Sequence, residues 1–410
     1  MTDVSFGGLL VVAAIALAAP LLVSLAPRAR IPADVVAIVA GIVVGPSVLD
    51  WVRVDTPIGV LALLGLAFLL FLAGAELDLD RLRGPLLRLA GTGFVLSVGI
   101  GIVAGLVFHA AGYVRSPFLL AVALSATSLG LVVPILKDAG QLERDLGQLV
   151  VAAASVADFG AILLLSFFFS ESGSGTAVKL LLVGGLVLLV AAVAIGLSRL
   201  NMSMGVSALL TRLQDTTAEI RVRIAIVLLV AFVAVAQRIG LEAILGAFLA
   251  GAILAATDRD TMSHPHFRAK LDAIGYGFLV PVFFVASGIR FDLQALTESP
   301  SAFARVPLFL LALLVVRGLP AGLYVRRVGR RSTVAAGLLQ ATSLPFLVTA
   351  VQIGLATGKV GSATGAALIF AGLLSVVLFP VGALTRLGRP AETHPAAQET
   401  ETSPLESSSA

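Results

Sequence analysis

The chain has 410 residues, of which 58% are hydrophobic and 13% are charged, and its mean hydropathy is +1.05. About one-quarter of the residues of an ordinary soluble domain are charged, and a soluble core of this size does not hide so much apolar surface. The net charge of +4 does not indicate nucleic-acid binding, because the basic residues lie mainly in short segments between apolar runs. The absence of Cys excludes disulfides, thiol nucleophiles and Cys-ligated metals. These properties predict an all-α, polytopic membrane protein.

Apolar runs of about 18 or more residues, long enough to cross a bilayer as helices, recur along the chain. Charged residues and Gly or Pro breaks divide them into thirteen candidate spans. The short run 241–257 is either a separate span or part of one bent hairpin. The predicted spans are 4–26, 32–49, 57–77, 85–112, 117–137, 145–169, 176–198, 220–238, 241–257, 271–289, 303–325, 332–356 and 361–386.

The distribution of basic residues predicts how the spans are oriented. Twenty of the 28 Lys and Arg residues follow odd-numbered spans, seven follow even-numbered spans, and Arg317 lies inside a span. Because Lys and Arg gather in cytoplasmic loops, we expect the N-terminus outside and the C-terminus in the cytoplasm. Residues 388–410 are polar and lack periodicity, which predicts a disordered cytoplasmic tail.

Spans five and twelve each contain a short polar patch and a Pro inside an apolar run. The patch is Ser-Ala-Thr-Ser-Leu from Ser125 in one span and Ala-Thr-Ser-Leu-Pro from Ala341 in the other. Spans that are seven apart run in opposite directions, as expected of an inverted repeat with a broken helix in each half. A match this short also arises by chance in a chain rich in Ala and Leu. The residues that mark the predicted breaks are Pro134, Thr342, Ser343 and Pro345.

One carboxylate, Asp158, lies near the middle of the sixth span. An ionised group there costs about 2.5 to 3.5 kcal/mol by insertion scales, so something must compensate it. The same oxygen atoms can hold either a proton or a dehydrated cation, and this competition is the minimum chemistry of an antiporter. We interpret Asp158 as the shared site for the proton and the transported metal ion. The alternative is a structural Asp that caps a broken helix or pairs with an Arg.

Several polar residues are candidate neighbours of this carboxylate. Arg317 is a fixed positive charge, because a guanidinium does not deprotonate, and it would balance the site; alternatively it snorkels to the cytoplasmic interface. Ser125, Thr127 and Ser128 offer hydroxyls, and an unwound backbone offers carbonyl oxygens, which are the hard ligands that a small alkali cation needs. The alternative for these hydroxyls is bonding to their own helix.

Two further features have structural interpretations. Glu76 ends the third span, where we expect it at the membrane interface. A face of small residues indicates tight helix packing or a dimer contact. This face consists of Gly246, Ala247, Ala250 and Gly251.

The segment from Gly65 to Leu77, Gly-Leu-Ala-Phe-Leu-Leu-Phe-Leu-Ala-Gly-Ala-Glu-Leu, resembles a signature of the cation:proton antiporter-2 family, which contains NapA and Kef-type exchangers. Further resemblances occur in family order between about residues 30 and 385. They cover residues 41–46, 125–134, 240–251 and 281–288.

This resemblance implies an inverted-repeat fold like those of NhaA and NapA, in which broken spans five and twelve cross beside Asp158. It implies a homodimer without cofactors in the bacterial plasma membrane, which exchanges H+ for Na+, K+ or Li+ by elevator-like movement of a core. The implied parts are 1–84 and 220–300, the dimerisation bundle; 85–170 and 301–387, the core bundle; 171–219, a linker helix and cytoplasmic loop; and 388–410, the tail.

Two departures from the family pattern bear on the site. Members commonly have Asp, Asn or Gln before the ion-binding Asp, and Ala157 stands there; the basic residue of span eleven is often Lys, and Arg317 stands there. One titratable carboxylate and one permanent cation predict electroneutral exchange of one proton per cation. We therefore expect a transporter and not an enzyme. The alternatives are transport of a small organic solute or anion on the same fold, and a non-transporting membrane sensor or scaffold.

Overall fold

The computed structural model describes residues 6–25, 31–76, 85–169, 184–186, 188–189, 192–193, 219–257, 265–297 and 300–387. The secondary-structure elements of this described part are all helical. They are α1 (Phe6–Leu25), α2 (Ala33–Val44), α3 (Thr56–Ala75), α4 (Pro85–Ala110), α5 (Pro117–Ser125), α6 (Leu129–Asp138), α7 (Asp145–Phe169), α10 (Ile220–Arg238), α11 (Ala243–Thr257), α13 (Pro265–Ile274), η1 (Gly275–Leu279), α14 (Val280–Ile289), α15 (Leu293–Thr297), α16 (Pro300–Gly318), η2 (Leu319–Tyr324), α17 (Val325–Gln340), α18 (Pro345–Ala356) and α19 (Ser362–Leu387).

These helices match the predicted spans, each of which coincides with one helix or with consecutive helices. The exception is span 176–198, which lies mostly outside the described residues, as do the predicted linker 171–219 and the tail 388–410. Within the described part, nine helical stretches are long and apolar enough to cross a membrane, and two shorter apolar helices accompany them. The predicted all-α polytopic membrane fold is therefore confirmed.

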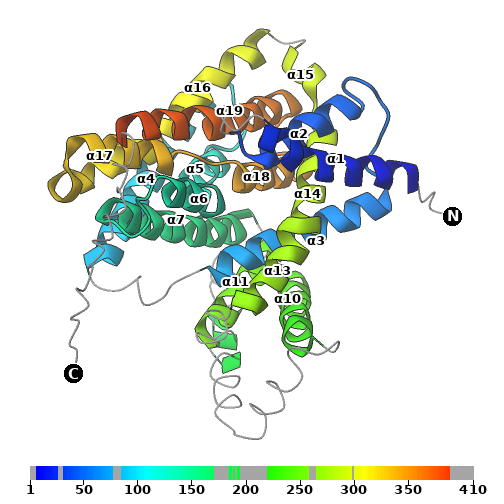
Figure 1. The fold of residues 1–410 in the computed structure, drawn as a ribbon. Helices are drawn as coiled ribbons and strands as arrows, with labels where there is room; N and C mark the ends of the chain where they lie inside the picture. Colours follow the sequence, from blue (N-terminus) through cyan, green and yellow to red (C-terminus); the bar gives the residue numbers. More distant parts are fainter. Residues whose placement is uncertain are drawn as a thin grey trace, which may run out of the picture.

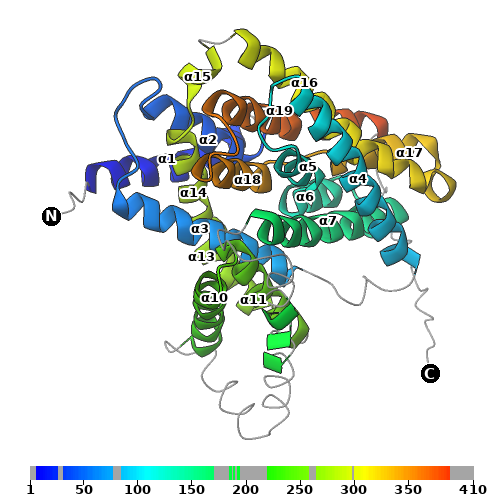
Figure 2. The ribbon, with the colours of Figure 1, turned by 180° about the vertical axis from the view of Figure 1, so that it is seen from behind.

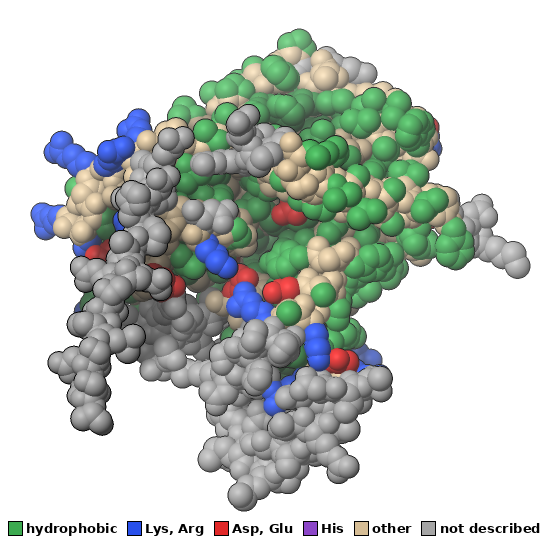
Figure 3. Space-filling model, viewed as in Figure 1, with side chains coloured by type: hydrophobic (Ala, Val, Ile, Leu, Met, Phe, Trp, Pro, Cys, Tyr) green, Lys and Arg blue, Asp and Glu red, His purple; other side chains and the backbone are tan. Residues whose placement is uncertain are grey.

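Hydrophobic side chains cover much of the molecular surface (Figure 3). Large apolar side chains are exposed on the outer faces of α1, α3 and α4, among them Leu10, Leu63 and Val95. Exposed apolar surface of this extent is unfavourable in water and favourable in lipid. Lys and Arg are concentrated near α17 and around the end of the molecule that contains α10 and α13 (Figure 3).

The helices pack as two groups (Figures 1 and 2). In the scaffold bundle, which comprises α1, α2, α3, α10, α11, α13, η1 and α14, α3 packs against both α11 and α14, and α2 packs against α14. In the core bundle, which comprises α4 to α7 and α16 to α19 with η2, α4 packs against α5 and α7, while α19 packs against α16, α17 and α18. The helix α7 of the core bundle also contacts α11 of the scaffold bundle.

A glycine separates the eleventh span from the twelfth. The backbone at Gly329 has φ +78° and ψ 163°, which interrupts the helical geometry of α17. Side chains of L-residues rarely adopt this conformation, whereas Gly does so without a steric penalty. The chain therefore leaves η2, turns at Gly329 and continues through Arg330–Gln340 as the first half of span twelve.

The small-residue face of α11 packs inside the scaffold bundle. A Cβ on Gly251 would overlap the backbone carbonyl oxygen of Phe71 on α3, and a Cβ on Gly246 would overlap that of Phe232 on α10. The tight packing predicted for this face is confirmed. The alternative of a dimer contact is wrong for these two glycines, because they contact helices of the same chain.

Replacing Gly251 with Val should destabilise the scaffold bundle. The added side chain forces α3 and α11 apart, and overpacking of this kind costs about 1 to 3 kcal/mol. Thermal unfolding in detergent should show a lower Tm for Gly251→Val. The control is Gly99→Val on α4, where an added Cβ meets no atom within 4 Å. Equal Tm values for the two variants would contradict the packing described above.

Candidate functional site

The polar patches of spans five and twelve are the points at which both helices break. The helix α5 ends at Ser125 and α6 begins at Leu129, with an extended backbone at Ala126 (φ −79°, ψ 156°) between them. The helix α17 ends at Gln340, and α18 begins at Pro345. Pro suits this first position of a helix because its missing N–H has no intrahelical partner there.

The two breaks cross and bind each other. The Ser128 N–H donates to the Thr342 carbonyl oxygen at 3.0 Å, and the Thr127 hydroxyl donates to the Gln340 carbonyl oxygen at 2.7 Å. An irregular backbone inside a bilayer must have its polar groups satisfied by protein or by a water-filled cavity. Each break therefore supplies hydrogen-bond partners for backbone groups of the other break.

Asp158 on α7 lies at the N-terminus of α6. Its Oδ2 accepts a hydrogen bond from the Leu129 N–H at 3.3 Å. The N-terminal end of a helix carries a partial positive charge, which stabilises a carboxylate there. The other oxygen, Oδ1, is buried and has no hydrogen-bond partner among the described residues. One half of the carboxylate is thus anchored, and the other half is available to a proton or a cation.

Arg317 on α16 is buried at the same crossing, with 1% of its surface exposed. Its Nε donates to the Thr127 hydroxyl at 2.8 Å, its Nη1 to the Ser97 hydroxyl at 3.1 Å and its Nη2 to the Ala153 carbonyl oxygen at 3.4 Å. It therefore does not snorkel to the interface. Its described partners are neutral oxygens, so it contributes positive charge near Asp158 without a direct ion pair.

The three hydroxyls singled out in the sequence have different surroundings. Thr127 accepts from Arg317 and donates to Gln340, and Ser125 donates to the Ala121 carbonyl oxygen of its own helix at 2.6 Å. Ser128 precedes α6 and makes no side-chain capping bond. Among the described residues, its hydroxyl is therefore the one of the three that makes no hydrogen bond.

The remaining break residues either form hydrogen bonds with the rest of the protein or lie past the crossing. The Ser343 N–H donates to the Ser375 hydroxyl at 3.3 Å, and the Thr342 hydroxyl donates to the Leu338 carbonyl oxygen at 3.3 Å. Pro134 lies inside α6, past the crossing. Ala157 is fully buried and offers no ligand atom.

The site also contains residues that sequence reasoning missed. Ser97 on α4 contacts Arg317, and the Gln340 side chain has a buried Nε2 without a hydrogen-bond partner in the described part of the chain. A polar residue within an apolar span was the available signal for Ser97. The same signal occurs at many serines that bond only to their own helix, so it did not distinguish this one.

Glu76 lies at the end of α3, where its Oε1 accepts from the Arg268 guanidinium at 2.8 Å. Its side chain is mostly buried, with 19% accessible, and its position at the membrane interface stays a prediction. This ion pair connects α3 with α13 inside the scaffold bundle.

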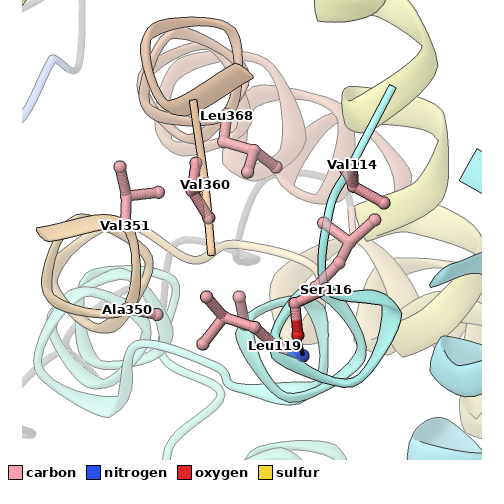
Figure 4. A pocket seen from close by; sticks show the side chains of 9 residues that line it. Val114, Ser116, Leu119, Ala350, Val351, Val360 and Leu368 are labelled. Carbon is pink, nitrogen blue, oxygen red and sulfur yellow. Dashed lines mark hydrogen bonds between the residues drawn. The ribbon is translucent and has the colours of Figure 1, made fainter. Parts of the chain in front are cut away.

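A small pocket lies elsewhere in the molecule, between α5, α18 and α19 (Figure 4). The side chains around it are apolar except for Ser116, whose hydroxyl already accepts from the Leu119 N–H at 3.4 Å. A single hydroxyl among apolar side chains does not provide the set of oxygen ligands that a cation needs.

Comparison with known proteins identifies the chain's relatives. The family model described as sodium/hydrogen exchanger, transmembrane, matches residues 13–384. The Bacillus subtilis protein YjbQ is 30% identical over 400 residues, which cover 93% of this chain and 63% of YjbQ. The Na+/H+-K+ antiporter GerN of Bacillus cereus is 29% identical over 289 residues, which cover 68% of this chain and 71% of GerN.

The fold has a counterpart among solved structures. The sodium proton antiporter MjNhaP1 from Methanocaldococcus jannaschii superposes with a TM-score of 0.64 over 92% of this chain and 96% of that one, at 15% sequence identity. Identity at this level establishes a shared fold. The family match, by contrast, spans most of the sequence. The chain therefore belongs to the sodium/hydrogen exchanger family of membrane transporters.

Proposed function

We propose that this chain exchanges protons for monovalent cations, Na+ or K+, at Asp158. The observation that supports this most directly is the half-anchored carboxylate. Its Oδ2 is bound to the N-terminus of α6, and its Oδ1 is buried without a partner among the described residues. A buried polar atom is costly unless it is paired, and a proton or a dehydrated cation is a partner of suitable size and charge. Because both occupy the same oxygen, binding of one excludes the other.

The cation ligands in this proposal are Asp158 Oδ1, the Ser128 hydroxyl and carbonyl oxygens of the unwound segment before α6. Hard oxygen ligands of this kind suit alkali cations. In this proposal the Thr127 hydroxyl positions its neighbours, because it accepts from Arg317 and donates to the Gln340 carbonyl oxygen. Arg317 offsets the negative charge when neither a proton nor a cation occupies Asp158.

Names of relatives support the choice of ions. GerN is described as a Na+/H+-K+ antiporter and MjNhaP1 as a sodium proton antiporter. Within the family we assign the chain to the cation:proton antiporter-2 group, on the basis of the motif from Gly65 to Leu77 and the other similar segments. Li+ is a further candidate substrate, because selectivity depends on cavity size and field strength.

Alternating access requires one part of the molecule to move relative to another. We propose that the core bundle carries Asp158 across the membrane, that the scaffold bundle forms a homodimer, and that the N-terminus lies outside and the C-terminus in the cytoplasm of a bacterial cell. Only the loaded carboxylate, neutralised by a proton or a cation, crosses. In an empty site the ionised Oδ1 of Asp158 would have no direct partner among the described residues, which is costly in a low-dielectric region even with Arg317 nearby.

The alternative of an organic anion substrate finds little support at this site. Arg317 would be the anion ligand, yet its guanidinium is engaged by Thr127, Ser97 and Ala153. Membership of an exchanger family also argues against a non-transporting sensor or scaffold.

Replacing Asp158 with Asn should abolish exchange, because an amide neither releases a proton nor attracts a cation. Cation-dependent dequenching of a pH-sensitive dye in proteoliposomes should fall to the level of empty liposomes. The control is Asp145→Asn, an exposed residue at the start of the same helix, which should transport normally. Residual cation-dependent proton flux in Asp158→Asn would rule out the proposed site.

Replacing Ser128 with Ala should raise the apparent KM for the cation. Loss of one oxygen ligand to a charged group is worth about 1.5 to 3 kcal/mol, which corresponds to roughly tenfold or more in affinity. The matched variant Ser125→Ala should change KM little, because the Ser125 hydroxyl binds only its own helix. The same KM change in both variants would remove Ser128 from the ligand set.

Exchange should be electroneutral, because Ala157 adds no second carboxylate beside Asp158. The initial rate of Na+-driven proton flux should stay the same when a membrane potential of either sign is imposed on the proteoliposomes. A rate that rises steeply with potential of one sign would indicate net charge movement, and hence a second titrating group.

A further inference from the structure

Tyr276 stands at an irregular point of the scaffold bundle. It belongs to η1, a π-helical turn between α13 and α14. Single π-helical turns inside α-helices are rare and occur frequently at functional sites. The Tyr276 side chain is 40% exposed, and its hydroxyl has no hydrogen-bond partner in the part of the chain that the structure describes. The proposed exchange mechanism assigns it no role.

The Tyr276 hydroxyl lies beside the first turn of α6. A Cβ on Gly130 would be 3.5 Å from this oxygen. Gly130 directly follows Leu129, whose N–H binds Asp158, and lies two residues beyond Ser128. A scaffold side chain is thus placed within one turn of the candidate cation ligands of the core bundle.

Charged residues continue from Tyr276 along the same helical face. Arg268, Asp272 and Tyr276 are spaced four residues apart, which places them on one side of α13 and η1. The Arg268 guanidinium lies 2.8 Å from Glu76 and 3.8 Å from Asp272.

The charge balance on this face is negative. Two carboxylates, Glu76 and Asp272, share the single guanidinium of Arg268, and the excess of negative charge favours cations near the phenol. A phenolic oxygen accepts from water and can contact a cation directly, so it suits a partly hydrated alkali ion.

We propose that the Tyr276 hydroxyl is a ligand for the transported cation, bound directly or through one water, as the ion passes between the Glu76 side of the protein and Asp158. This inference rests on the proposed exchange at Asp158. Because Tyr276 belongs to the scaffold bundle and Asp158 to the core bundle, the contact exists only while the site faces the Glu76 side. Tyr276 therefore contributes to cation binding in one direction of access only.

This arrangement predicts a one-sided effect. Tyr276→Phe keeps the ring and removes the oxygen, so it should raise the apparent KM for Na+ or K+ on the Glu76 side by about tenfold, as expected for one lost contact to a charged ligand. The apparent KM on the opposite side and the maximum rate should stay close to those of the unmodified protein. The apparent KM on each side is measured with everted and with right-side-out membrane vesicles, both prepared from one bacterial strain that expresses the protein.

The control is Phe278→Leu, an exposed residue of the same π-helical turn. It should leave both KM values unchanged. Equal KM increases on both sides in Tyr276→Phe would indicate a structural role and overturn the proposal, as would unchanged KM values on both sides. If the unmodified protein itself shows no cation-dependent proton flux, it is the exchange proposal that fails, and the two failures are therefore distinguishable.

Discussion

The architecture depends on one requirement, that backbone polar groups inside a bilayer find partners within the protein. Two transmembrane helices of this chain are interrupted, and each interruption frees N–H and carbonyl groups in an apolar environment. The segments meet that requirement by crossing, with Ser128 bonded to Thr342 and Thr127 bonded to Gln340. These bonds hold the four half-helices in place. The ends of the half-helices carry partial charges, which therefore lie inside an otherwise apolar region.

The buried charges follow from this crossing. Asp158 is anchored by the N-terminus of α6, and Arg317 is held by Thr127, Ser97 and the Ala153 carbonyl. Because Arg317 binds neutral oxygens, its positive charge lowers the cost of an ionised Asp158 without occupying the carboxylate. A direct ion pair would compete with a cation for the same oxygens. The separation of the two charges therefore suits reversible binding.

The two bundles differ in how they are held together. In the scaffold bundle, glycines bring backbones into direct contact, as Gly251 does with Phe71 and Gly288 with Ile38. Between the bundles, the described hydrogen bonds include those from Gln352 to Ser287 and from the Glu242 N–H to Ser166, both at 3.2 Å. Close backbone packing resists rearrangement, whereas a few side-chain bonds can be exchanged. This contrast is compatible with one bundle moving against the other.

The sequence by itself determined the helical membrane fold, the positions of the breaks and the presence of two charged residues, Asp158 and Arg317, inside apolar spans. These features are local. An apolar run of sufficient length is expected to span the bilayer, and a charge within it is costly unless the protein compensates it. Tertiary structure alone decided which hydroxyl at the crossing makes no hydrogen bond among the described residues. It also placed Ser97 and Gln340 at the crossing and Tyr276 beside the first turn of α6. The reason is that these roles depend on contacts between distant segments, such as Thr127 and Gln340, which are 213 residues apart. Such contacts leave no periodic pattern in the chain.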